Sequence, residues 1–382
     1  MSKLGTYFVA SVLCFSATTN AQQTTQNPEP PNPVLNKRPP AKPVPTQTAV
    51  ERAGSLKLDV VVRDAAGKLV AGLEPWDFAL LDNGKPQKIL SFHEFNDTTV
   101  KPEPPVEVIL LLDMANLPFS QVAFVRQQVD QFLHQSGGQL QQPMSLIVLT
   151  SAGIRVQPRP SVDGDALAGI VKQLSGNIST INPAMGGEGL TERFQLSVRQ
   201  LETIAENEVR KPGRKLLIWV GPGWPLLNRS DLGSYSEKDQ KRYFDGIVEL
   251  SNQLRNARLV VDSVAPANGA QGSADTNYAL LYQNFLKPVR TWHDADAGNL
   301  ALKVLVTETG GLILGPDNDL AEQIDRCVAD ANGFYRVSFN PPAAEHADEF
   351  HELKVTVDKP GMTVRTNTGY YSEQATQSIA TQ

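Results

Sequence analysis

Cysteine is almost absent from this chain of 382 residues, which contains only Cys14 and Cys327. Cys14 lies in an apolar N-terminal stretch, apart from the rest of the chain. Cys327 falls on the apolar side of a predicted helix, with Ile324, Val328 and Ala331. This position predicts a buried, unreactive thiol and not a nucleophile. If the N-terminal stretch is removed, the single remaining cysteine excludes an intramolecular disulfide, even in an oxidising compartment.

A permanent membrane anchor is not predicted either. The apolar stretch from Tyr7 to Phe15 is shorter than the roughly 20 residues that a transmembrane helix needs. Lys3 precedes it and the small residues 19–21 follow it, which is the pattern of a secretory signal peptide over residues 1–21. We therefore expect an exported protein, periplasmic or extracellular, with no transmembrane anchor after cleavage. Lipidation of Cys14 is the alternative, although Leu13 stands where a lipoprotein signal has a small residue.

An excess of positive charge is missing as well. The chain has 35 Lys and Arg against 41 Asp and Glu, which gives a net charge of -6. Proteins that bind nucleic acid or anionic lipid through charge usually carry a basic face. Partners of these two kinds are therefore not expected.

Known catalytic and cofactor-binding motifs are absent. No Gly-x-Ser-x-Gly or Gly-x-x-x-x-Gly-Lys occurs, and no Gly-x-Gly-x-x-Gly follows a strand. The acids around Asp296 and Asp319 are better explained as helix starts than as metal ligands. The five histidines are scattered, without the helical pairing of a zinc protease; they are His93, His134, His293, His346 and His351. We therefore expect that the protein is not an enzyme and binds no cofactor. A hydrolase with an unrecognised site is a minor alternative.

The N-terminal third of the chain changes character twice. Residues 22–54 are rich in Pro, Gln, Thr and Asn, which predicts a disordered spacer. Residues 55–98 are β-rich: apolar residues alternate over 56–62, and Asn83-Gly84 between the strand-like segments 78–82 and 88–95 is a strong hairpin signal. Three prolines within residues 100–105 indicate a linker.

Residues 104–332 alternate between apolar runs and amphipathic segments. This rhythm predicts a doubly wound, mostly parallel α/β sheet of Rossmann type, with helices on both faces. Residues 333–372 return to strands, which we expect to complete a small β-module with 55–98, and 373–382 form a disordered tail. The expected parallel strands are 106–112, 144–150, 215–220 and 259–264, and the expected helices are 119–135, 192–210, 239–257 and 317–331.

The order of these segments resembles the VWFA-related Acidobacterial domain proteins, a von Willebrand factor A-like family. The similarity covers roughly residues 55–372. It implies a von Willebrand A domain flanked by a β-module on an exported bacterial protein, and it does not imply an enzyme. The motifs that carry it are LDVVVRDAAGKLVAGLEPWDFALLDNGKPQKILSF, VILLLDMAN, GRKLLIWVGPGWP, ETGGLILGPDNDLAEQIDRCV, FYRVSFNPP and FHELKVTVDKPGMTVRTNTGYY.

The resemblance also implies a metal-binding site, but this sequence lacks most of its ligand residues. Metal-binding von Willebrand A domains carry Asp-x-Ser-x-Ser after the first strand, and here those slots hold Asp113, Ala115 and Leu117. The third-loop acid is replaced by Gly221. Asp113, Asn116 and Thr180 are the remnant candidates, with Ser179 or Thr191 as alternative hydroxyls to Thr180. They would hold Mg²⁺ only weakly.

Two further readings concern the same edge of the sheet. Asp113 and Asn116 precede the helix predicted from Phe119, where they are suited to cap it and to shape the loop. The turn at 221–225 would present Trp224 at the rim as a binding anchor, or else Trp224 packs in the core. We therefore expect a non-enzymatic protein-interaction module with a degenerate metal site and a rim that includes Asn116 and Trp224. The alternative is metal-dependent adhesion through a remnant site at Asp113.

Overall fold

The structure is a computed structural model that describes residues 54–96, 102, 104–157, 159–173, 186–228, 236–267 and 281–372. The chain divides into two units, Met1–Gln47 and Thr48–Gln382, and every element below belongs to the second. The expected signal peptide, all but Gly54 of the expected spacer, the C-terminal tail and Thr180 lie outside the described residues.

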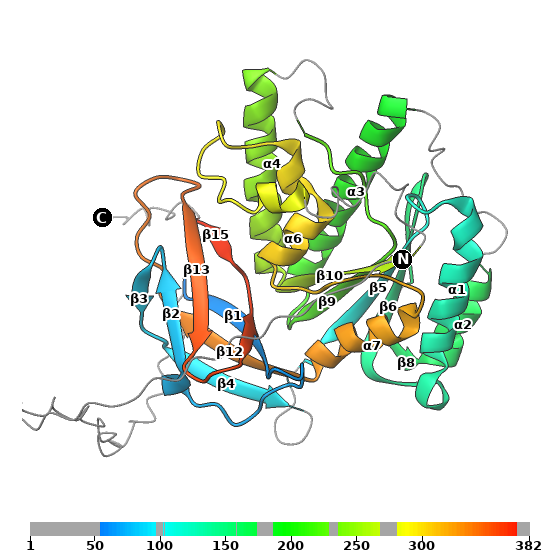
Figure 1. Ribbon diagram of the computed structural model, residues 1–382, viewed down its shortest axis with the longest axis horizontal. Coiled ribbons are helices and arrows are strands. Elements are labelled where there is room, and N and C mark those ends of the chain that lie inside the picture. Colours follow the sequence, from blue (N-terminus) through cyan, green and yellow to red (C-terminus); the bar gives the residue numbers. More distant parts are fainter. Residues whose placement is uncertain are drawn as a thin grey trace, which may run out of the picture. The chain divides into compact units, whose positions relative to one another are not determined.

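A central sheet of seven strands forms the core of the α/β part (Figure 1). Its order is β11-β10-β9-β5-β6-β7, with β8 also paired to β6. The order of the chain reverses between β5 and β9, and the crevice at such a reversal is where doubly wound folds bind ligands. The parallel strands are β5 (Glu107–Asp113), β6 (Gln139–Thr150), β9 (Lys215–Val220), β10 (Leu259–Pro266) and β11 (Ile313–Asp317), and β7 (Gly153–Val156) and β8 (Ser161–Asp163) run antiparallel to β6.

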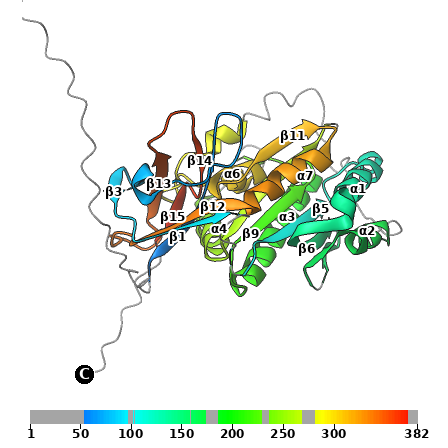
Figure 2. The same cartoon turned by 90° about the horizontal axis from the view of Figure 1, so that it is seen from below.

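Helices cover both faces of this sheet, because its central strands are apolar on both sides. In β5, Leu110 and Leu112 pack toward one face, while Ile109 and Leu111 pack toward the other. Figures 1 and 2 show the two helical layers. One layer contains α1 (Phe119–Leu133), α2 (Gly164–Gln173) and α7 (Leu320–Val328), and the other contains α3 (Gly186–Val209), α4 (Glu237–Asn256) and α6 (Leu302–Glu308).

A β-sandwich is formed by the segments that precede and follow the α/β part in the sequence. The predicted fold class is confirmed. One four-stranded sheet has the order β14-β1-β12-β4 and the other has the order β15-β13-β2-β3. The first sheet contains β1 (Leu56–Arg63), β4 (Ser91–Asn96), β12 (Gly333–Phe339) and β14 (Thr363–Arg365), and the second contains β2 (Phe78–Asp82), β3 (Lys85–Gln87), β13 (Phe350–Val357) and β15 (Gly369–Tyr371).

The hairpin at Asn83-Gly84 is confirmed, but its second strand is shorter than predicted. Asn83 and Gly84 both have positive φ (46° and 75°), as a two-residue hairpin turn requires. β2 pairs only with β3. The chain then crosses to the other sheet, where β4 pairs with β12. A hairpin strand over 88–95 is therefore wrong: the hairpin partner of β2 is the earlier segment 85–87, residues 88–90 form no strand, and 91–96 pair with β12 in the other sheet.

Buried ion pairs join the β-sandwich to the α/β part. The Asp330 carboxylate accepts from Arg63 of β1 and from Arg365 of β14. The guanidinium of Arg258, just before β10, donates to Asp59 Oδ1 at 2.6 Å. Burial alone would raise the pKa of Asp59, but Arg258 and its cationic neighbours hold it below its usual value.

Cys327 is a free, fully buried thiol in the layer of α7, as predicted, and burial raises its pKa.

Asp296 and Asp319 accept from the backbone N–H groups of Gly298 and Glu322 at helix starts, which confirms their interpretation as helix-start acids. Among the helices that the structure describes, none combines the length and apolar character needed to cross a membrane.

Candidate functional site

Asp113 lies at the C-terminal end of β5, at the point where the order of strands reverses, and it is fully buried. Its two carboxylate oxygens accept four hydrogen bonds. Asn116 donates its backbone N–H to Oδ1 at 3.0 Å and its side-chain amide to both oxygens at 2.9 Å. Trp219 donates its indole N–H to Oδ2 at 2.8 Å. The protein itself therefore satisfies this carboxylate.

Three elements supply these partners. Asn116 belongs to the loop after β5, and its amide also donates to Ser197 Oγ of α3 at 3.0 Å. Trp219 lies in β9, directly beside Leu111 of β5. Sequence reasoning missed Trp219 and Ser197. A signal existed for Trp219, because a buried indole N–H needs an acceptor and the neighbouring strand ends in an acid. Nothing in the helical pattern singled out Ser197.

Burial dominates the electrostatics of this cluster. It raises the pKa of Asp113 to about 6, although the hydrogen bonds from Trp219 and Asn116 and the guanidinium of Arg193 act in the opposite direction. Arg193 is a buried residue of α3 that donates to the carbonyl of Gly189 at 3.3 Å. A protein cation therefore already lies close enough to Asp113 to stabilise its charge.

The residues around Asp113 do not fit a divalent cation. Mg²⁺ needs oxygen ligands, but the groups that face Asp113 are N–H donors. Ala115 and Leu117 are buried in the two opposite cores. A Cβ at Gly221, the place of the third-loop acid, would lie 2.8 Å from Asp113 Cβ. Within the described ranges, no three His, Cys, Asp or Glu side chains are grouped as a metal site.

The expected capping of α1 by Asp113 or Asn116 is wrong. The residue at the N-cap is Pro118, which has no side chain able to accept a hydrogen bond there. Asp113 instead accepts the N–H of Asn116 within its own loop. The loop is also tied to the next strand, because Met114 and Ala115 both donate their N–H groups to Leu149 of β6. The loop-shaping interpretation therefore holds for Asp113.

Trp224 is not presented at the rim. It is 5% exposed, its indole N–H donates to the carbonyl of Leu300 at 3.0 Å, and its ring packs edge-on against Trp219 with centroids 5.0 Å apart. The packing alternative is correct, because the turn at 221–225 directs this side chain inward. Asn116 is also buried, at 5% exposure. Neither expected rim residue offers a side-chain surface to a partner.

The exposed aromatic residue next to this loop is Phe119. It is the first residue of α1, and 76% of its surface is accessible. Sequence reasoning overlooked it, because an apolar residue at a helix start resembles the beginning of the buried stripe. The stripe in fact begins with Gln121 and Val122. Phe119 therefore takes the place at the rim that was expected for Trp224.

A histidine and an aspartate form a second buried pair, in the β-sandwich. His351 Nδ1 lies 2.8 Å from Asp82 Oδ1, and Tyr370 donates its hydroxyl to Asp82 Oδ2 at 2.7 Å. A catalytic base of this kind needs a nucleophile within reach. His351 is 3% exposed, and its Nε2 has no hydrogen-bond partner among the described residues. The pair therefore has the geometry of a structural contact.

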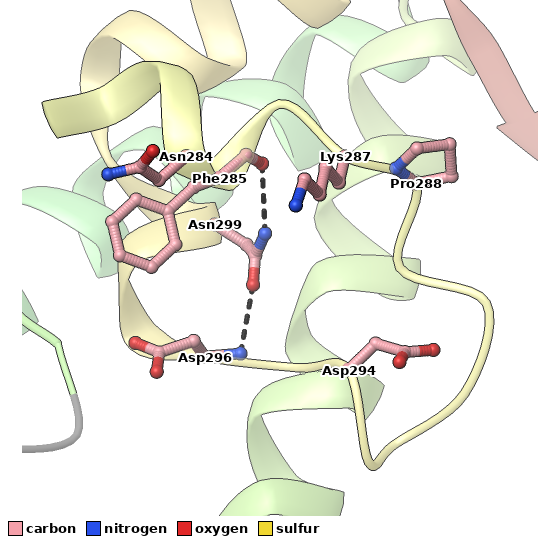
Figure 3. A pocket seen from close by; sticks show the side chains of 7 residues that line it. All are labelled: Asn284, Phe285, Lys287, Pro288, Asp294, Asp296 and Asn299. Carbon is pink, nitrogen blue, oxygen red and sulfur yellow. Dashed lines mark hydrogen bonds between the residues drawn. The ribbon is translucent and has the colours of Figure 1, made fainter. Parts of the chain in front are cut away.

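A cavity of about 320 Å³ lies beside the 3-10 helices η5 (Tyr282–Phe285) and η6 (Ala297–Leu300). Figure 3 shows Asn299 in the middle of its lining, with Lys287 and the two carboxylates around it. This cavity was not anticipated from the sequence. Its lining residues are Asn284, Phe285, Lys287, Pro288, Asp294, Asp296 and Asn299.

Comparison with known proteins gives distant structural similarity alone. No family profile and no curated protein matches the chain in sequence. The pilus adhesin SpaC from Lactobacillus rhamnosus GG, in its open conformation, is 11% identical over 82% of this chain and 48% of SpaC, with a TM-score of 0.36. This chain thus spans about half the length of SpaC. A von Willebrand factor type A protein from Catenulispora acidiphila is 13% identical over 85% of this chain and 76% of that protein, with a TM-score of 0.31.

Proposed function

We propose that this chain is an exported, non-enzymatic protein-interaction module of the von Willebrand A type, a member of the VWFA-related Acidobacterial domain proteins. It binds its protein partner without an obligatory metal ion. Two observations support the fold part of the proposal: the spaced sequence motifs and the doubly wound sheet with a flanking β-sandwich. Export rests on the signal-peptide pattern of residues 1–21.

The arrangement around Asp113 carries the metal-independent part of the proposal. A metal-dependent adhesion site has to leave its acid free to coordinate the ion. Here Asn116 and Trp219 occupy both oxygens of Asp113, and its pKa of about 6 reflects a site that disfavours charge. These groups act as the internal support of the loop. Binding then depends on the outer surface that the loop positions.

Phe119 is the residue on that surface with the chemistry of an anchor. Exposed aromatic side chains contribute a large apolar area, and phenylalanine is among the residues enriched in protein interfaces. Phe119 follows the loop that Asp113 and Asn116 hold in place. We therefore place the centre of the partner-binding surface at the N-terminus of α1.

Thermal unfolding with and without metal tests the metal-independent part. A ligand that binds only the folded state must raise the melting temperature. We expect millimolar Mg²⁺ or Mn²⁺ to leave the melting temperature unchanged. A rise that disappears in Asp113→Ala would support metal-dependent adhesion through the remnant site instead.

Capture of a partner from an extracytoplasmic extract tests the surface. Phe119→Ala should reduce capture of the same identified protein by about tenfold or more, without a change in melting temperature. Val209→Ala is the matched control, because Val209 is an exposed apolar residue with 43% of its surface accessible. It is the last residue of α3, just before the N-terminal end of β9, and so lies at the edge of the sheet opposite the proposed surface. Equal capture by both variants would contradict the proposed surface.

A further inference from the structure

We propose that the cavity between η5 and η6 is a binding site for a small zwitterion, an amino acid or a short peptide that carries both an ammonium and a carboxylate group. This inference concerns a second site and does not depend on the partner-binding surface. None of the residues around Asp113, and not Phe119, lines the cavity.

The walls of the cavity are held in place by the protein's own hydrogen bonds. Asn299, which is buried, donates its amide to the carbonyl of Phe285 at 3.0 Å and accepts from the backbone N–H of Asp296 at 2.8 Å. Both bonds are drawn in Figure 3: the first connects η6 to η5, and the second fixes the start of η6. A Cβ at Gly298 would lie 2.5 Å from the ring of Phe285, so the close approach of the segments depends on this glycine. The site is thus formed before a ligand arrives.

One carboxylate of the lining has a fixed position and a free oxygen. Asp294 Oδ2 accepts from the N–H of Thr291 at 3.1 Å and from its hydroxyl at 2.9 Å. Asp294 Oδ1 makes no hydrogen bond within the part of the chain that the structure describes. An ammonium group is the natural partner for such an oxygen, because charge-assisted hydrogen bonds are the strong ones.

The lining also contains a cation that no carboxylate neutralises. Lys287 is exposed and forms no ion pair or hydrogen bond with any described residue. In Figure 3 its ammonium group points toward Asn299, away from the carboxylate groups of Asp294 and Asp296. The positive and negative groups are therefore separated around the cavity and do not cancel one another.

This separation of charge selects the class of ligand. A simple anion would pair with Lys287 and leave the two carboxylates of the lining without a counter-charge, and a simple cation would leave Lys287 without one. A molecule with a carboxylate at one end and an ammonium group at the other can pair with Lys287 and with a carboxylate of the lining at the same time. A volume of about 320 Å³ lies at the lower end of the range for ligand pockets. The cavity therefore suits a small molecule, with the ring of Phe285 against its apolar part.

Titration calorimetry on the full chain tests this assignment with three molecules of similar size. Glycylglycine carries both charges, N-acetylglycine only the carboxylate, and glycylglycinamide only the ammonium group. We expect glycylglycine to bind, and the two singly charged analogues to bind about tenfold more weakly or not at all. L-alanine, a second zwitterion, should bind as well.

Two substitutions connect any binding to the cavity. Lys287→Ala and Asp294→Asn should each weaken glycylglycine binding about tenfold, while Lys85→Ala, an exposed lysine of β3, should leave it unchanged. Because Lys287 is exposed and supports no described contact, its variant should keep the native melting temperature and remain a valid test. Absence of heat with both zwitterions, or equal binding of N-acetylglycine, would overturn the proposal.

Discussion

The indole N–H of Trp219 donates to Asp113 Oδ2 at 2.8 Å, and this bond connects two adjacent parallel strands at the place where the chain order reverses. A crevice at this place normally receives a ligand. Here the hydrogen-bond partner of the Asp113 carboxylate is a side chain of the protein itself. The bond gives the fully buried Asp113 a partner in place of water. Asp113 also accepts from the backbone N–H of Asn116, so it stabilises the loop after β5.

Trp219→Phe should destabilise the protein by about 2 kcal/mol or more, because it removes the N–H donor of a buried acceptor and part of a buried ring. Urea unfolding would measure the loss. The cost should be larger at pH 8 than at pH 5, since Asp113 has a pKa of about 6 and its ionised form needs the donor more. Trp76→Phe is the control, because Trp76 is 58% exposed, and it should change stability little. An equal cost at both pH values would indicate a packing effect alone.

Much of the fold was predictable because it depends on patterns of local burial. The runs at 106–112 and 215–220 are apolar except for Glu107 and Lys215, and they become β5 and β9 at the centre of the sheet. The helix predicted over 119–135 becomes α1. Short edge elements were not predicted. β7 and β11 have only four and five residues, too few for a periodic signal.

The candidate site was predictable only in part, because its contacts join residues far apart in the sequence. Asp113 was identified by its position after a buried strand. Its partner Trp219 lies 106 residues away in the sequence. The sequence of that strand indicates only that it is buried in the core. The reverse error occurred with Trp224, where a glycine-rich turn suggested exposure. A turn fixes the path of the backbone, and packing decides where the side chain goes.

Stability should fall as the pH rises from about 4 to about 7. Burial, together with the carboxylate of Asp330, raises the pKa of Asp262 to about 7, above the value near 3.9 of an unfolded chain. In this window the folded state binds more protons than the unfolded state, so the free energy of unfolding decreases with pH. Burial also raises the pKa of Glu308, to about 8, which extends the decrease above pH 7. One such group gives a slope approaching about 1.4 kcal/mol per pH unit.

Urea unfolding over a pH series would measure this slope in two variants. Asp262→Asn keeps an acceptor for the N–H of Leu312, which now donates to Asp262 Oδ1 at 2.6 Å. It should make the decrease less steep by the contribution of one group, while Asp113 and Glu308 keep theirs. Asp245→Asn, an exposed acid of α4, should leave the slope as in the parent chain. A rise in stability over the same window would contradict the assignment.

Asp330→Asn should destabilise the chain by about 3 kcal/mol or more, because it leaves the guanidinium groups of Arg63 and Arg365 without their shared carboxylate. Asp330 is almost fully buried, so water cannot replace the lost partner. Asp325→Asn is the matched control, since Asp325 is exposed on the neighbouring helix α7. The two free energies of unfolding should differ by most of the predicted loss. Similar values would show that the ion pairs at this junction contribute little.

Gly221→Asp should fail to create a metal site, although it restores an acid at the third-loop position. Gly221 has a φ of 149°, and a Cβ there would meet Asp113 Cβ at 2.8 Å. The substitution forces Asp113 to move and adds a second negative charge at a buried site, so we expect a loss of about 2 kcal/mol or more. Gly169→Ala is the control for an added Cβ, because nothing lies within 4 Å of that position in α2, and it should be neutral or slightly stabilising. A native-like melting temperature for Gly221→Asp that rises further with Mg²⁺ would show that the loop after β5 can still open to an ion.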